Sequence, residues 1–216
     1  MAERNRVLPD GSIVAVPARG AWMGNRGCLH EGHQIVRPWR LRAWLVCRLS
    51  FRGRQVAQWA PRRYTPLFFL DEAVAFAAGH RPCGECRHHD YLAYRDAAGA
   101  ASAGELDARL HAERLAGPAR VPWRDLPDGA FALTPEGPAL VLGDRLIRWN
   151  DQAYAYGTTA PRPRSGSVDA LTPPTTLDVL RTGFPVQIHD AAGAGGTVPG
   201  GILLPLLGVH SGAIRR

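Results

Sequence analysis

The stretch Tyr64–Cys86 (YTPLFFLDEAVAFAAGHRPCGEC) limits the possible folds of this chain more than any other segment. An apolar run leads into an alanine-rich segment, Asp71–Ala78, which predicts a short helix with its aspartate as the N-cap. Gly79 follows, at the position where a residue of positive φ ends a helix. The chain then enters a tight Cys-x-x-Cys corner at Cys83 and Cys86, and such a corner is half of a typical zinc site.

The chain has four cysteines, and all lie in its first 86 residues: Cys28, Cys47, Cys83 and Cys86. Four thiolates are the ligand set of a closed structural zinc site, so we expect all four to bind one zinc ion. Eighteen residues separate Cys28 from Cys47, so the tertiary structure must bring these two to the corner. His30 and His33 lie close to Cys28 in sequence, and they are candidate substitutes for a thiolate.

Other interpretations of the cysteines stay open at this point. A disulfide is disfavoured because neither a secretory signal nor a membrane-spanning run precedes the domain. A redox Cys-x-x-Cys needs a low-pKa thiol, usually at a helix N-terminus, whereas this motif follows the C-terminal end of a predicted helix. Cys47 lies in the strand-like run AWLVC, which is consistent with an inert buried thiol.

The segment FFLDEAVAFAAGHRPCGECR resembles the metal-binding domain of the Ada DNA-repair proteins, over about residues 64–87. In that family a phenylalanine-rich stretch and an alanine-rich helix lead into a Pro-Cys-x-x-Cys corner, and four cysteines hold one zinc ion. The resemblance implies that Cys83 and Cys86 are zinc ligands. It also implies a DNA-repair setting, since one zinc-bound thiolate of the family accepts a methyl group from a DNA phosphotriester.

The first two cysteines of Ada domains lie close together, unlike Cys28 and Cys47 of this chain. The methyl-accepting role is therefore not carried over to either thiol. The chain as a whole also resembles an uncharacterised family of bacterial proteins of similar length.

The 216 residues are enough for one large domain or two small ones, and an apolar fraction of 45% supports a real core. No run is long enough to span a bilayer, so we expect a soluble, cytoplasmic protein without a membrane partner. The formal net charge is +7, and all 26 basic residues are arginine. The excess of basic over acidic residues favours an anionic partner such as nucleic acid.

Arginines alternate with aromatic and aliphatic residues over Arg40–Gln58, which predicts a β-hairpin around Arg52-Gly53. Such a pattern suits phosphate contact and base stacking, although a solvated sheet face gives the same pattern. The arginines that we expect to contact phosphates are Arg54, Arg62, Arg63, Arg81 and Arg87.

The second half predicts mostly β-structure, with short apolar runs broken by Gly, Pro, Asp and Asn. A short helix over LDVLRTG, residues 177–183, capped by Thr175 or Thr176 and ended by Gly183, and a last strand over Phe184–His189 complete it. We therefore expect an α+β fold: a zinc-tied hairpin and helix module over residues 1–116, a small mostly β module over 117–190, and a disordered tail over 191–216.

These features favour a zinc-binding protein that binds nucleic acid, most readily DNA, in repair or modification. The first alternative is a hydrolase or nuclease acting on nucleic acid or nucleotides. Its catalytic candidates are His111 and Glu113, and the further polar residues left for it are Asp71, Glu72 and His80. The second alternative is a zinc-folded adaptor that binds another protein. Whether the protein is an enzyme stays open.

Overall fold

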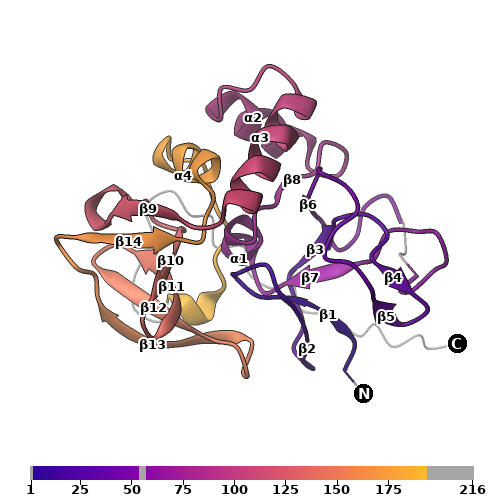
Figure 1. Ribbon diagram of the computed structural model, residues 1–216, viewed down its shortest axis with the longest axis horizontal. Coiled ribbons are helices and arrows are strands. Elements are labelled where there is room, and N and C mark those ends of the chain that lie inside the picture. The colour runs from indigo at the N-terminus through magenta and orange to yellow at the C-terminus, as the bar shows by residue number, and fades with distance from the viewer. Residues whose placement is uncertain (1, 54–56, 194–216) are drawn as a thin grey trace, which may run out of the picture.

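The computed structural model describes residues 2–53 and 57–193, and the fold is mixed α+β, as the sequence predicts (Figure 1). The first sheet has six strands in the order β2-β1-β7-β3-β6-β8. In chain order these are β1 (Arg4–Val7), β2 (Ile13–Ala15), β3 (Trp22–Asn25), β6 (Leu45–Cys47), β7 (Leu67–Phe69) and β8 (Arg81–Pro82). The pairs β1–β7 and β6–β8 are parallel, and the others are antiparallel. A separate ribbon pairs β4 (His30–Glu31) with β5 (Gln34–Ile35).

The second sheet also has six strands, in the order β13-β12-β11-β10-β14-β9, and all its pairs are antiparallel. Its strands are β9 (Ala119–Pro122), β10 (Phe131–Thr134), β11 (Gly137–Leu142), β12 (Arg145–Asn150), β13 (Ala155–Pro161) and β14 (Ser167–Ala170). The hairpin turn between β11 and β12 is Gly143-Asp144, with Gly143 at φ 58°.

The described residues form four α-helices: α1 (Glu72–Ala77), α2 (His88–Ala97), α3 (Ala103–Ala116) and α4 (Pro174–Arg181). Figure 1 shows α1 in the middle of the molecule, between the two sheets. Every residue of α1 is buried, which explains why only alanine, valine and phenylalanine follow its first residue, Glu72. Gly79 ends the α1 segment at φ 80°, as predicted.

One continuous apolar core joins both sheets to α1. It extends from Val7 in β1 through Phe76 in α1 to Leu140 in β11. The change from the first sheet to the second falls between the end of α3 and the start of β9, close to the predicted boundary at residue 117. The division into modules itself stays a prediction. Of the predicted tail, Asp190–Ala192 forms a 3-10 turn, and residues 194–216 lie outside the described residues.

The buried carboxylate of Asp71 holds two distant segments, β13 and the chain after α4, at the start of α1. Asp71 Oδ1 caps the helix by accepting from the Val74 amide at 2.9 Å. Its Oδ2 accepts from the Tyr156 hydroxyl at 2.7 Å and from the His189 amide at 2.9 Å. Burial raises the pKa of Asp71, and these hydrogen bonds oppose the rise. The N-cap predicted from sequence therefore also holds β13 and the chain after α4.

Three local predictions are wrong. The hairpin over Arg40–Gln58 does not form among the described residues, because β6 has β3 on one edge and β8 on the other. Phe184–His189 is not a strand, and its backbone binds the carboxylates at the start of α1 instead. The N-cap of α4 is Pro173 rather than a threonine, because the helix begins at Pro174 and both threonines lie inside it. The Thr175 hydroxyl donates to Glu113 instead.

In the part of the chain that the structure describes, no helix has both the length and the apolar composition to cross a bilayer.

We expect Asp71→Ala to lower the free energy of unfolding by about 3 kcal/mol, since it removes a cap and leaves two buried donors unpaired. Ser102→Ala is the matched control, because Ser102 caps α3 from an exposed position with the Glu105 amide as its partner. That change should cost only about 1 kcal/mol. Urea unfolding of both variants measures the difference, and equal losses would contradict the role given to Asp71.

Candidate metal centre

Three cysteines from two distant segments converge at one end of the first sheet. The sulfur atoms of Cys47, Cys83 and Cys86 lie within 4.8 Å of one another. The parallel pairing of β6 with β8 produces this, because it places Val46 opposite Pro82 and lets the Cys83 amide donate to the Val46 carbonyl at 3.0 Å. Cys86 is then brought in by the turn of the Cys-x-x-Cys corner. Such a cluster could hold a metal ion.

Backbone amides point at two of these sulfurs. The Glu85 amide donates to Cys83 Sγ at 3.4 Å, and the Arg48 amide donates to Cys86 Sγ at 3.4 Å. Hydrogen bonds from the Cys47 thiol lower the pKa of Cys83 to about 5 and also lower that of Cys86. The pKa of Cys47 is raised, chiefly by those same hydrogen bonds. Cys83 thus has thiolate character near neutral pH, the pKa of Cys86 is shifted in the same direction, and the thiolate is the form that binds metal ions.

Cys83 and Cys86 lie directly before the N-terminal end of α2. From the sequence, we compared the motif only with the C-terminal end of the preceding helix. In the structure α2 begins at His88, directly after the corner, so the positive end of its dipole is near Cys86. The electrostatic objection to low-pKa thiols here therefore does not hold.

A small cavity of about 150 Å³ opens beside the three sulfurs. Its wall is partly apolar, with Met23, Leu45 and Phe51, and partly polar, with Asn25 and Tyr64. Among the described residues, no further Cys, His, Asp or Glu belongs to the sulfur cluster. A metal ion held by the three sulfurs would therefore have a fourth coordination position toward this cavity.

Cys28, predicted as the fourth ligand, lies outside this cluster. Its thiol approaches the His30 carbonyl at 3.8 Å, and it lines a neighbouring groove instead. His30 and His33 are not in the cluster either: His30 Nδ1 is 2.6 Å from the Thr65 hydroxyl, and the His33 ring stacks on Trp59 at 5.7 Å. The structure thus brings together three of the four predicted cysteine ligands.

The arginines predicted to contact phosphates fall into two groups. Arg62 and Arg63 are exposed, whereas Arg54 lies outside the described residues. Arg81 and Arg87 are buried in ion pairs and are not available to an external phosphate. Arg81 binds both carboxylate oxygens of Asp107, at 2.7 and 2.8 Å.

Arg87 lies 2.5 Å from Glu72 and 2.8 Å from Asp90. Its guanidinium also lies over the Trp22 ring, at 4.3 Å from the centroid. A basic residue beside a zinc motif has the same sequence signature whether it faces solvent or a buried carboxylate, so sequence alone could not separate the two groups.

The catalytic candidates do not form a site with each other. Glu113 accepts hydrogen bonds from the amide and the hydroxyl of Thr175, at the start of α4. His111 packs against Trp39 at 4.6 Å instead. The remaining candidates also have structural partners: Asp71 and Glu72 hold the start of α1, and His80 accepts from Arg26 at 3.1 Å.

Sequence reasoning missed a groove of about 870 Å³ that adjoins the cysteine cluster. Asn25 and Tyr64 line both the groove and the cavity at the sulfurs. The other residues that give the groove its character are three arginines and a tryptophan, namely Arg37, Arg40, Arg62 and Trp59. The spacing of arginines and aromatics signals such a surface, but only the tertiary structure selects its members.

No family model, no curated protein and no solved structure matches this chain. The resemblance to the Ada metal-binding domain therefore stays a prediction from the sequence motif.

We expect the purified chain to bind one zinc ion, and Cys28→Ser to retain it, because Cys28 lies outside the sulfur cluster. Cys83→Ser should lose zinc or bind it at least about tenfold more weakly, since it removes a thiolate ligand. Elemental analysis after dialysis gives the stoichiometry. Equal loss of zinc in the two variants would contradict the three-cysteine centre.

We expect Arg87→Ala to lower the free energy of unfolding by about 3 to 5 kcal/mol, because it leaves Glu72 buried without its partner. Arg95→Ala is the control, since its ion pair with Asp96 is at the surface, and it should change stability far less. Urea unfolding measures both. Similar losses in the two variants would show that the buried pair is not the structural link described here.

Proposed function

We propose that this chain is a zinc-binding protein that binds nucleic acid, with Cys47, Cys83 and Cys86 as zinc ligands. The observation that carries the proposal is the convergence of three sulfurs beside a groove lined by arginine and aromatic side chains. The two features share Asn25 and Tyr64 as a common wall. The proposal keeps the function expected from sequence and changes the residues that carry it.

Zinc is the metal that this ligand set favours. Thiolates are soft ligands that select zinc, copper(I) or iron–sulfur clusters, and zinc accepts three protein ligands with a fourth position left for another group. Zinc here would tie β6 to the start of α2 and stabilise the edge of the first sheet. This would be the zinc-tied module expected from sequence, with strand pairing in place of the expected hairpin.

The groove has the composition of a surface for a phosphate-bearing strand. Arg40 and Arg62 are exposed. Arg37 forms an exposed ion pair with Glu31 at 3.0 Å. Because an exposed pair contributes little free energy, a phosphate can compete with Glu31 for Arg37. Trp59 also lines the groove, but its ring is only 9% exposed, with His33 stacked on it and its Nε1 donating to Glu3 at 3.0 Å. The three arginines of the groove therefore carry the proposed binding of nucleic acid.

The alternative of a hydrolase has less support in the structure. Glu113 already accepts from Thr175, and His111 contacts Trp39, so neither is positioned with the other as an acid–base pair. A protein-binding adaptor stays an alternative that the test below separates.

We expect a fluorescent single-stranded DNA to bind the zinc-loaded chain with an affinity that falls steeply as salt rises. The double change Arg40→Ala and Arg62→Ala should weaken binding and reduce the slope of log affinity against log salt by about 1.4 if both arginines contact phosphates of the single strand. Arg124→Ala is the control, because its side chain is 81% exposed and lies away from the groove, in the 3-10 turn Trp123–Asp125 between β9 and β10 of the second sheet.

Fluorescence anisotropy across a salt series measures all variants, with RNA of the same sequence as a second probe. Absence of binding at low salt, or equal effects of the groove and control changes, would exclude this groove as the nucleic-acid surface. Recovery of a stoichiometric protein partner without nucleic acid would favour the adaptor instead.

A further inference from the structure

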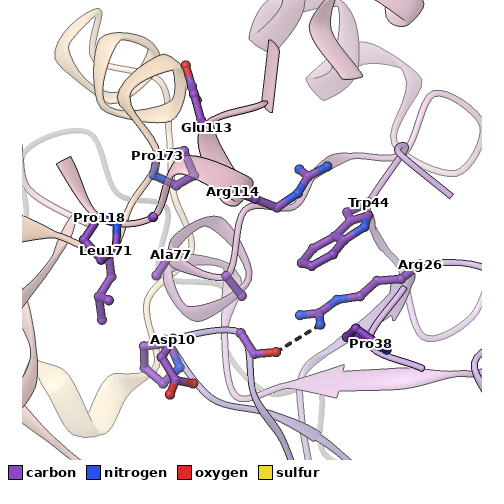
Figure 2. A pocket seen from close by; sticks show the side chains of 14 residues that line it. Asp10, Arg26, Pro38, Trp44, Ala77, Glu113, Arg114, Pro118, Leu171 and Pro173 are labelled. Atoms are coloured by element: carbon purple, nitrogen blue, oxygen red, sulfur yellow. Dashed lines mark hydrogen bonds between the residues drawn. The ribbon is translucent and has the colours of Figure 1, made fainter. Parts of the chain in front are cut away.

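A second cavity, of about 220 Å³, lies where the two sheets and the helices meet (Figure 2). Its wall comes from the turn between β1 and β2, the end of α1, the end of α3 and the segment before α4. It shares no lining residue with the cysteine cluster or with the arginine groove. What occupies it is therefore a separate question from the metal centre.

Arg26 is a buried charge in the wall of this cavity, with an exposed fraction of 1%. Its Nε donates to His80 Nε2 at 3.1 Å, and its Nη1 donates to the Gly11 carbonyl at 2.9 Å, the dashed line in Figure 2. Its Nη2 is buried and has no hydrogen-bond partner in the structure. Figure 2 shows the guanidinium reaching from the side of the cavity toward the turn that carries Asp10.

Arg114 places a second guanidinium at the same cavity. Arg26 and Arg114 both lie on Trp44, at 3.8 and 4.3 Å from its ring centroid, and Figure 2 shows the indole between them. Arg114 donates to the carbonyls of Gly79 and Arg42 at 2.7 Å each, whereas its buried Nε has no hydrogen-bond partner. Two donors in the wall are therefore left unpaired.

Neither guanidinium has a negative partner in contact. Within residues 2–53 and 57–193, no ion pair includes Arg26 or Arg114, and the acceptors they use are carbonyls and a histidine. His80 is neutral, since burial and the two guanidiniums hold its pKa well below the usual value. Burial also lowers the pKa of Arg26 to about 9 and that of Arg114 to about 10.

The two carboxylates that line the cavity, Glu113 and Asp10, do not neutralise the two guanidiniums. Glu113 is occupied by Thr175, and the carboxylate of Asp10 accepts from the amide and hydroxyl of Ser12 at 2.9 and 2.7 Å. Buried charges in proteins are normally paired, because an isolated one carries a large desolvation cost. This arrangement thus leaves positive charge unbalanced beside a cavity that has room for a further group.

We propose that this cavity binds a compact oxyanion, a phosphate or carboxylate group, through Arg26 and Arg114. Pockets for drug-sized ligands have volumes of about 300 to 1,000 Å³, so a cavity of about 220 Å³ suits an inorganic ion or the anionic end of a small molecule. The anion balances the charge of the two guanidiniums, which lie on either side of Trp44 in the wall of the cavity. Two cations on one indole hold the donors in place before the anion arrives.

Thermal unfolding of the zinc-loaded full chain tests this with sodium phosphate, sodium acetate and sodium chloride at equal ionic strength. A specific anion stabilises the folded state as its concentration rises, and chloride controls for screening. We expect phosphate or acetate to raise the melting temperature beyond chloride. Phosphate also stabilises proteins non-specifically by exclusion from their surface, so stabilisation by phosphate alone identifies a phosphate site only where the Arg114→Gln variant loses it. Stabilisation by acetate alone identifies a carboxylate site.

Three variants locate the effect. Asp10→Asn keeps the oxygen that accepts from Ser12 and removes a negative charge beside the cavity, so the anion should bind about threefold more tightly. Asp144→Asn removes an exposed charge in the hairpin turn of the second sheet and should leave the affinity unchanged. Arg114→Gln removes one guanidinium and should weaken the affinity at least about tenfold.

Equal melting curves in all three salts would overturn the proposal and leave the two guanidiniums as a structural stack on Trp44. Equal affinity of Asp10→Asn and Asp144→Asn would also overturn it, and this comparison stands even if Arg114→Gln folds poorly, because Asp10 is exposed.

Discussion

The parallel pairing of β6 with β8 is the constraint on which the first half of the molecule depends. These strands are only three and two residues long, yet their register sets Cys47 beside Cys83 across the ladder. Buried α1 and the turn at Gly79 carry the chain from β7, inside the sheet, to β8 at its edge. The cysteine cluster is thus a product of how α1 packs between the sheets, and a metal ion there would strengthen an edge that few hydrogen bonds hold.

The buried arginines show two different solutions to the same electrostatic problem. Arg81 and Arg87 are paired with carboxylates, so their charges serve to join segments of the fold. Arg26 and Arg114 are surrounded by neutral acceptors and an indole, so they leave positive potential unbalanced in a cavity. A count of basic residues cannot distinguish these cases. The paired arginines are unavailable to a partner, whereas the unpaired arginines have positive charge that an anionic partner can neutralise.

The parts of the fold that sequence predicted well are those with local causes. The α1 segment has its cap and its terminating glycine in the sequence, and β10 to β12 alternate between short turns. The predictions failed where a partner was distant. The edges of β6 were taken by β3 and β8 rather than by the following residues, and the chain after α4 paired with Asp71 and Glu72 instead of with a strand.

The sequence by itself determined the helix before the Cys-x-x-Cys corner, the β-character of the second half and the cysteines as the candidate metal ligands. These follow from local propensity and from the chemistry of the side chains, which do not depend on distant contacts. Only the tertiary structure decided which third cysteine joins the corner, which arginines are neutralised and where the unpaired ones gather. Such choices depend on strand register and burial, because both bring together residues that are far apart in the chain.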